Sequence, residues 1–141
     1  MYVTRVATGR RAHRPPAPWH SGPVTDLSTQ PWYADHEWLT VPDLVERLGL
    51  PVGRVHRLVE DRVLLGGRAS GTFVVPAAFL RDDEPLAELR GTLTVLADNG
   101  FTDDEALEWM LTEEESLGTF PTAALLAGRK AEVRRVAQSL L

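Results

Sequence analysis

Apolar positions recur with the 3.6-residue period of an α-helix in two neighbouring segments, residues 41–48 and 52–63. Thr40 is placed to cap the first segment and Gly49 to end it, because threonine accepts hydrogen bonds from helix N-termini and glycine adopts the left-handed conformation readily. Pro51 suits the start of the second segment. The apolar stripe of this second segment consists of Val52, Val55, Leu58, Val59 and Val63. The pattern predicts two helices joined by a tight turn.

The pattern changes after residue 63, where two leucines lead into the stretch GGRASGTFVVP. Gly66, Gly67 and Gly71 bracket a turn, and residues 72–75 have the composition of a strand. We therefore expect a β-hairpin with Arg68 at its tip. Pro76 is expected to open a short helix that reaches Leu80.

Beyond the acidic break at residues 82–85, the apolar pattern is wholly helical. Leucines at 86, 89, 93 and 96 predict a helix that Asn99-Gly100 closes. Thr102 and Glu105 have the spacing of a capping box for the next helix. Two further helices are expected, a short one that starts at Pro121 and is interrupted by Gly128, and a last one whose apolar face holds Val133, Val136, Ala137 and Leu140.

The N-terminal stretch lacks such periodicity, and residues 1–38 hold five of the ten prolines. We expect a disordered basic arm over residues 1–31, with order beginning near Trp32, because aromatic residues tend to dock on a domain. Residues 32–81 are then a winged helix-turn-helix and residues 82–141 a helical C-terminal domain. The predicted fold class is mainly α with a small β-hairpin.

Composition narrows the function classes. The chain has no cysteine, so disulfides and thiolate metal sites are excluded. No apolar run is long enough to span a membrane, and the basic N-terminus has no apolar core of the kind that signal peptides need. We therefore expect a cytoplasmic protein without a membrane partner.

The overall charge of −5 argues against a nucleic-acid partner, but its distribution does not. Residues 1–14 carry four arginines and no acid, and residues 39–81 carry six arginines against four acids. Residues 82–141 carry five basic residues against thirteen acids. A basic front half and an acidic rear half fit a chain whose front meets phosphates.

A helical wheel of the second helix indicates which residues would meet DNA. At about 100° per residue, Arg57 lies nearly opposite the apolar stripe and is flanked by Gly53 and Arg54. Recognition helices present such residues to base edges and phosphates in the major groove. We expect Gly53, Arg54, His56 and Arg57, with Arg68 on the wing, to bind double-stranded DNA. The alternative is a solvated helix face, in which the arginines are partnered by Glu60 and Asp61.

These residues also carry a family resemblance. Residues 39–80, LTVPDLVERLGLPVGRVHRLVEDRVLLGGRASGTFVVPAAFL, resemble the winged-helix domains of the MerR and excisionase type. The span from Leu39 to Leu141 is similar to small actinobacterial DNA-binding proteins that join such a domain to a helical C-terminal domain. That resemblance implies a transcriptional regulator linked to Ser/Thr protein kinases, which phosphorylate a threonine in the N-terminal arm. The matching positions are Thr8 and, second, Thr4.

A second resemblance concerns the C-terminal half. The segment WMLTEEESLGTFPTAALLAGRKAEVRRVAQSLL resembles the small helical module of Xre/MbcA/ParS-type antitoxins, which implies a protein-binding or dimerising role. A homodimer through the C-terminal helices would place two recognition helices on two half-sites. The alternative is a helical buttress that completes the core of the winged domain. A competing function is therefore a protein-interaction module that does not read DNA.

No arrangement typical of an enzyme is visible. A nucleophile with its base, paired carboxylates, a metal cluster and a phosphate-binding loop are all missing from the pattern. The four histidines are scattered, and Gly66-Gly67 is not followed by the Gly-Lys-Ser/Thr of a nucleotide loop. We expect a protein that is not an enzyme and that has no cofactor and no metal.

Overall fold

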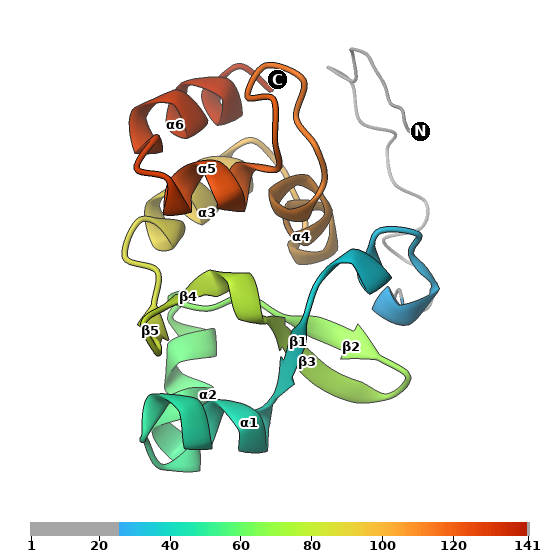
Figure 1. Cartoon of the computed structure of the whole chain (residues 1–141), viewed down its shortest axis with the longest axis vertical. Helices are drawn as coiled ribbons and strands as arrows, with labels where there is room; N and C mark the ends of the chain where they lie inside the picture. Colours follow the sequence, from blue (N-terminus) through green and yellow to red (C-terminus); the bar gives the residue numbers. More distant parts are fainter. Residues whose placement is uncertain (1–25, 141) are drawn as a thin grey trace.

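The computed structural model describes residues 26–140 of the 141-residue chain (Figure 1). The predicted arm falls mainly on residues 1–25, which lie outside the described residues, as do Thr4 and Thr8. The first half contains 3-10 helices at Leu27–Thr29 and Tyr33–Asp35, then β1 (Trp38–Thr40), α1 (Val41–Leu48), α2 (Val52–Glu60), β2 (Gly67–Ala69) and β3 (Thr72–Pro76). The second half contains a 3-10 helix at Ala77–Phe79, β4 (Leu80–Arg81), β5 (Glu84–Pro85), α3 (Leu89–Asp98), α4 (Asp103–Leu111), α5 (Pro121–Leu126) and α6 (Lys130–Gln138).

The predicted fold class is confirmed. Helices α1 and α2 pack together and are followed by the β2–β3 hairpin, which projects sideways from the molecule (Figure 1). The helical half, α3 to α6, lies on the other side of the sheet from α1 and α2. This order of a helical pair, a hairpin and then further helices is that of a winged helix-turn-helix followed by a helical region.

Local sequence signals account for α1. The Thr40 hydroxyl accepts a hydrogen bond of 3.3 Å from the N–H of Asp43, and the Asp43 carboxylate accepts one of 3.0 Å from the N–H of Thr40. This capping box satisfies donors that the first turn of a helix leaves free. Gly49 ends the helix with a φ of 67°. Both predicted ends of the helix are confirmed.

The sheet has a third strand that the sequence pattern does not predict. Strand β1 pairs antiparallel with β3, with Trp38 opposite Pro76 and Thr40 opposite Val74, so the strand order is β1-β3-β2. A strand of three residues shows no measurable alternation, and its pairing partner lies more than thirty residues away. The hairpin prediction was therefore right but incomplete.

The acidic stretch predicted as a simple break forms a second hairpin. Arg81 of β4 pairs with Glu84 of β5, and the turn residues Asp82 and Asp83 have φ values of 54° and 63°. Aspartate tolerates this left-handed conformation better than most side chains. The expected boundary between residues 81 and 82 lies at this turn.

Part of the predicted arm is folded onto the domain. The expected arm reached residue 31, but Asp26 caps the 3-10 helix Leu27–Thr29 and Leu27 is buried. Leu27 lies against β2, where a Cβ added to Gly67 would meet the Leu27 Cδ1 at 2.9 Å. The apolar side chain of Leu27 explains this docking, which a proline-rich composition concealed.

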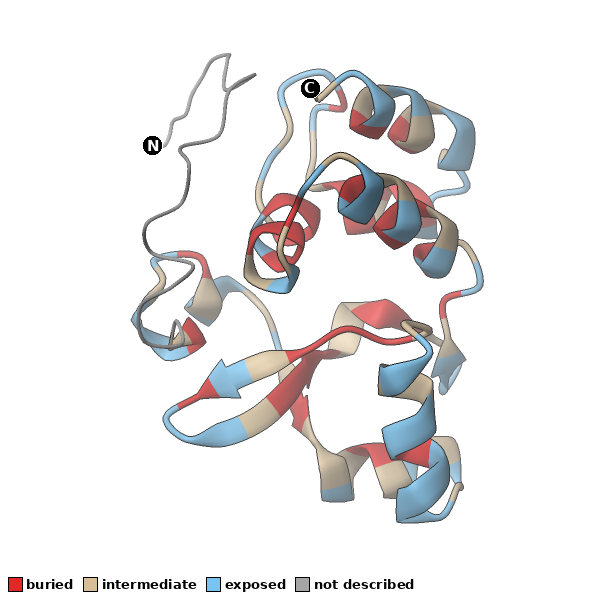
Figure 2. Ribbon diagram, turned by 180° about the vertical axis from the view of Figure 1, so that it is seen from behind, coloured by how far each residue is buried: buried red, intermediate tan, exposed pale blue. Residues whose placement is uncertain are grey.

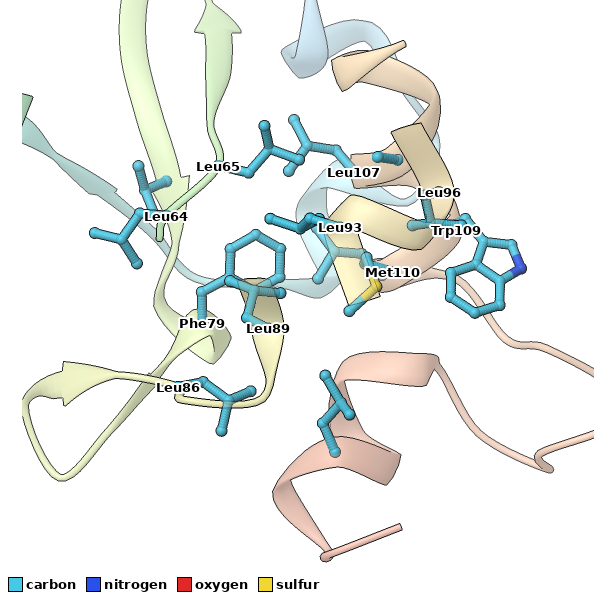
Figure 3. Close-up of a cluster of buried hydrophobic side chains, with 14 of the residues drawn as sticks. Leu64, Leu65, Phe79, Leu86, Leu89, Leu93, Leu96, Leu107, Trp109 and Met110 are labelled. Carbon is cyan, nitrogen blue, oxygen red and sulfur yellow. The ribbon is translucent and has the colours of Figure 1, made fainter. Parts of the chain in front are cut away.

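One hydrophobic core joins the two halves of the chain. Figure 3 shows Leu64, Leu65 and Phe79 of the winged helix facing residues of α3 and α4. The residues of the helical half in this cluster are Leu86, Leu89, Leu93, Leu96, Leu107, Trp109 and Met110. The helical half therefore acts as a buttress that completes the core of the winged helix.

Two apolar residues are placed differently from the prediction. The helix expected from Leu86 begins at Leu89, although Leu86 itself is buried beside it. Val52 was assigned to the apolar stripe of α2, but its side chain is 52% exposed. Val52 is the first residue of α2, and the core is reached only from Val55 onward.

Candidate nucleic-acid interface

Helix α2 presents a polar face to solvent. Val55 is buried and Leu58 and Val59 are partly buried, so the opposite side of the helix faces solvent. The four residues predicted on this helix to meet DNA are all exposed, and they are Gly53, Arg54, His56 and Arg57. Figure 2 shows exposed residues along the side of α2 that is turned toward the viewer.

Ion pairs divide the six arginines of residues 39–81 into two groups. Arg47 pairs with Asp83 at 2.9 Å, Arg62 with Asp103 at 2.7 Å, and Arg81 with Glu88 at 3.5 Å. The Arg81 guanidinium also donates to the carbonyls of Leu125 and Leu126 at the end of α5. These three arginines connect structural elements to one another.

The other three arginines are the ones predicted to bind DNA, and they make no ion pair within residues 26–140. Arg54 and Arg57 also have no side-chain hydrogen bond to another described residue. The predicted alternative, in which Glu60 and Asp61 partner these arginines, is therefore not what the structure has. Guanidinium groups without protein partners keep their N–H donors available for phosphates or guanine edges.

Arg68 lies on the wing, two residues before the turn. It is in β2 opposite Phe73, so its expected place at the tip is wrong; the turn residues are Ser70 and Gly71, with φ values of 51° and 84°. Positive φ at both central positions is the geometry of a type I′ turn, one of the two common two-residue hairpin turns. The exposed Arg68 side chain donates a hydrogen bond of 3.3 Å to the Gly71 carbonyl, which directs it along the hairpin toward the turn.

Two glycines of the winged helix serve different purposes. A Cβ on Gly53 would meet nothing within 4 Å, so the fold does not require glycine there, and the position leaves α2 open to close approach. A Cβ on Gly66 would collide with the carbonyl of Val74 and lie 2.7 Å from Phe73 Cζ. Gly66 therefore allows β3 to pack closely, which explains a glycine at this position without any nucleotide loop.

Sequence reasoning missed one exposed residue of this surface. Val52 begins α2 next to Gly53, and its helical period suggested a place in the core. The sequence signal that could have shown this is the position of Val52 in the first turn, ahead of the first core residue, Val55.

Several charged residues of the helical half contact neighbours within that half. Arg129 pairs with Glu132 at 2.7 Å, and this hydrogen bond is the main reason that the pKa of Glu132 is lowered. Arg134 packs its guanidinium against Gly91 of α3. Glu114 accepts hydrogen bonds from the Trp109 indole and the Ser116 N–H.

Residues 26–140 contain no cluster of three or more His, Asp or Glu side chains that could hold a metal ion. None of the helices in this range has the length and apolar character needed to cross a membrane.

Known proteins share both halves of this arrangement. Residues 28–80 match the family described as "DNA-binding protein Rv2175c, wHTH domain", and residues 86–140 match "Rv2175c C-terminal domain of unknown function". The DNA-binding protein Rv2175c of Mycobacterium tuberculosis (strain ATCC 25618 / H37Rv) is 30% identical over an alignment of 119 residues, and the match covers 75% of this chain and 82% of that protein. The chain belongs to the Rv2175c family.

The Rv2175c fold is also similar in three dimensions. The NMR structure of Rv2175c superimposes with a TM-score of 0.71 at 30% identity, over 82% of this chain and 86% of that one. The resemblance to a small winged-helix DNA-binding family is therefore confirmed across both halves. The second resemblance, of the C-terminal half to antitoxin modules, stays a prediction.

Proposed function

We propose that this chain binds double-stranded DNA through its winged helix and acts as a transcriptional regulator. Helix α2 would enter the major groove, with Arg57, Arg54 and Gly53 against the duplex, and Arg68 of the wing would contact the adjacent backbone or minor groove. Membership of the Rv2175c family supports DNA as the partner.

The observation that carries the proposal is the division of the arginines. Three of six in residues 39–81 are ion-paired to acids and hold elements together, whereas Arg54, Arg57 and Arg68 are exposed without an acidic partner among the described residues. The three unpaired arginines all lie on α2 and β2, whereas the three paired ones lie outside these two elements, which supports α2 and the wing as the surface that binds phosphates.

The experiment is fluorescence anisotropy of a labelled duplex over a salt series. Each phosphate contact contributes about −0.9 to the slope of log K against log salt. The variant Arg54→Ala/Arg57→Ala should weaken binding and reduce the slope by up to about 2. The full chain is used, because removing residues before Pro31 would also remove Asp26 and the buried Leu27.

A matched control separates the recognition helix from net charge. Arg90→Ala/Arg135→Ala removes the same two charges from exposed positions on α3 and α6. It should leave affinity and slope nearly unchanged. Equal losses in both double variants would mean that only overall charge matters. Absence of binding by the wild type at low salt would favour the competing function, a protein-interaction module that does not read DNA.

The proposal also covers the N-terminal arm, a kinase, a second copy of the chain and the absence of an enzymatic reaction. The four arginines of residues 1–14 would add nonspecific affinity for DNA, and a Ser/Thr protein kinase acting on Thr8 or Thr4 would reduce it. A homodimer would let one regulator read two half-sites, and sedimentation of the full chain with and without DNA tests it. We also propose that the chain works by binding and not as an enzyme.

A further inference from the structure

Val52 is an apolar side chain that the fold leaves in solvent. Among the described residues only Val52 and Leu126 are large hydrophobic side chains in the exposed class, at 52% and 38% exposure. Leu50, Leu58 and Val59 pack against the core as partly buried residues, and Val52 is absent from that set. Burial of Val52 therefore contributes little to folding, and its side chain is available for contact with a partner.

The position of Val52 suggests that role. It is the first residue of α2, and recognition helices direct their N-terminal residues at base edges. Its neighbour Gly53 leaves open space where a Cβ would stand. His56 follows four residues later, about 40° away around the helix, so Val52 and His56 lie one above the other on the same edge of the exposed face.

Base edges in the major groove offer one apolar group in unmodified DNA, the C5 methyl of thymine. Polar atoms of guanine, cytosine and adenine would gain nothing from an aliphatic side chain that displaces their water. The valine side chain, in contrast, is well suited to bury a methyl group. We infer that Val52 reads a thymine in the bound duplex by van der Waals contact with its C5 methyl, beside bases or phosphates contacted by His56 and Arg57.

This inference rests on the proposed function, and its test starts from DNA that the protein itself selects. The full wild-type chain is used to enrich binding sequences from a library of random duplexes. Every thymine in the enriched site is then replaced in turn by uracil, which removes only the C5 methyl. At the position that responds, matched duplexes carry cytosine and 5-methylcytosine opposite guanine, because 5-methylcytosine presents the same methyl group.

The wild type should bind the thymine duplex about fourfold more tightly than the uracil duplex at one position, the ratio expected from burying one methyl group. Val52→Ala should bring that ratio close to one. Leu126→Ala, which shortens the other exposed hydrophobic residue, should keep the wild-type ratio. Thermal unfolding of Val52→Ala should match the wild type, because the side chain lies outside the core.

The outcomes separate the two levels of the proposal. If an enriched site exists but no thymine-to-uracil change alters wild-type binding, or if Val52→Ala retains the ratio, the assignment of Val52 is overturned while DNA binding stands. Tighter binding of the 5-methylcytosine duplex than of the thymine duplex would overturn thymine as the source of the methyl. If no sequence is enriched, the chain has no base preference, and both this assignment and a sequence-reading regulator are overturned.

Discussion

The carboxylate of Asp26 accepts a hydrogen bond of 3.0 Å from the backbone N–H of Ser70, a residue 44 positions further along the chain. The same oxygen accepts hydrogen bonds from the N–H and the hydroxyl of Ser28. Ser70 is the first of the two turn residues of the wing, so the start of the described chain fastens the turn of the β2–β3 hairpin. A residue outside the winged helix-turn-helix thereby helps to position the wing.

This contact predicts a pH dependence of the wing. The pKa of Asp26 is lowered from its ordinary value of 3.8, chiefly because the Ser70 N–H stabilises the carboxylate. A lowered folded-state pKa stabilises the contact above the ordinary pKa, and that contribution disappears as the pH falls through the folded-state value. Protection of the Ser70 amide, measured as its exchange rate relative to the intrinsic rate at the same pH, should therefore be high near neutral pH and should be lost only at pH values below the ordinary 3.8.

Two Asp26 variants make this prediction specific. Asp26→Ala should expose the Ser70 amide to exchange at all pH values, whereas Asp26→Asn keeps an oxygen acceptor without a titrating proton and should remove the pH dependence. Amide exchange measured by NMR distinguishes the three proteins. Equal protection of Ser70 in the wild type and Asp26→Ala would show that the turn holds itself without Asp26.

A pair of glycine variants should separate lack of space from backbone strain. Gly66→Ala places a Cβ against the Val74 carbonyl and 2.9 Å from Val75 Cγ2, so the sheet must move. We expect a loss of about 2 to 3 kcal/mol in the free energy of unfolding, as for other overpacked sites. Gly49→Ala meets nothing within 4 Å but has a φ of 67°, so only strain of about 1 to 2 kcal/mol is expected.

Urea denaturation measures both variants. A larger loss for Gly49→Ala than for Gly66→Ala would contradict the assignment of Gly66 to close packing of β3. The comparison uses the same chemical change, one methyl group, at two sites of different geometry.

The parts of the fold that could be predicted from sequence are those with local causes. Helix α1 has its cap and its terminating glycine within ten residues, and the capping box of Thr102 and Glu105 is confirmed in the structure by mutual hydrogen bonds. The third strand escaped prediction because three residues carry no period and the pairing of Trp38 with Pro76 is nonlocal. Periodicity indicates which side of a helix is apolar, but it does not indicate how far along the helix the core extends. For this reason Val52 was wrongly assigned to the buried stripe of α2.

The candidate site shows the same division. The identities of the exposed residues on α2 followed from a helical wheel, since Val55 fixes the buried side. Which arginines lack an ion pair within residues 26–140 could not follow from sequence, because Arg47, Arg62 and Arg81 find their acids 36, 41 and 7 residues away. Local charge balance around Arg57 suggested partnering by Glu60 and Asp61, and the tertiary structure leaves Arg57 without an ion pair among the described residues.

Arg62, which follows α2 and its C-cap, links α2 to the helical half. Arg62 has a φ of 61° and donates to Asp103 at the start of α4 at 2.7 Å. Arg62→Ala and Arg62→Gly both remove this ion pair, but only glycine relieves the left-handed backbone. Arg62→Gly should therefore be more stable than Arg62→Ala by about 1 kcal/mol. Denaturation of the two variants side by side measures this difference.

The ion pair itself should be weak, since both side chains are partly exposed. A double-mutant cycle of Arg62→Ala with Asp103→Ala should give a coupling of about 0.2 to 1 kcal/mol, and high salt should reduce it. A coupling that does not respond to salt would assign the effect to packing of the Arg62 side chain.

Phosphorylation of the arm is predicted to weaken DNA binding without abolishing it. Residues 1–25 carry four arginines and no acid, so a phosphate of about −1.5 to −2 at Thr8 would reduce their charge of +4 to about +2. Phosphate contacts are salt-dependent, so the loss of affinity should be largest at low salt and should shrink as salt increases.

Intact mass after incubation with a Ser/Thr protein kinase establishes modification, and Thr8→Ala, with Thr4→Ala beside it, locates the phosphate. Anisotropy of modified and unmodified protein then measures the loss, and an Arg54→Ala/Arg57→Ala background should show the same proportional effect, because the arm and the recognition helix would contact separate phosphates. An effect that disappears in that background would mean that the phosphate acts on the recognition helix directly.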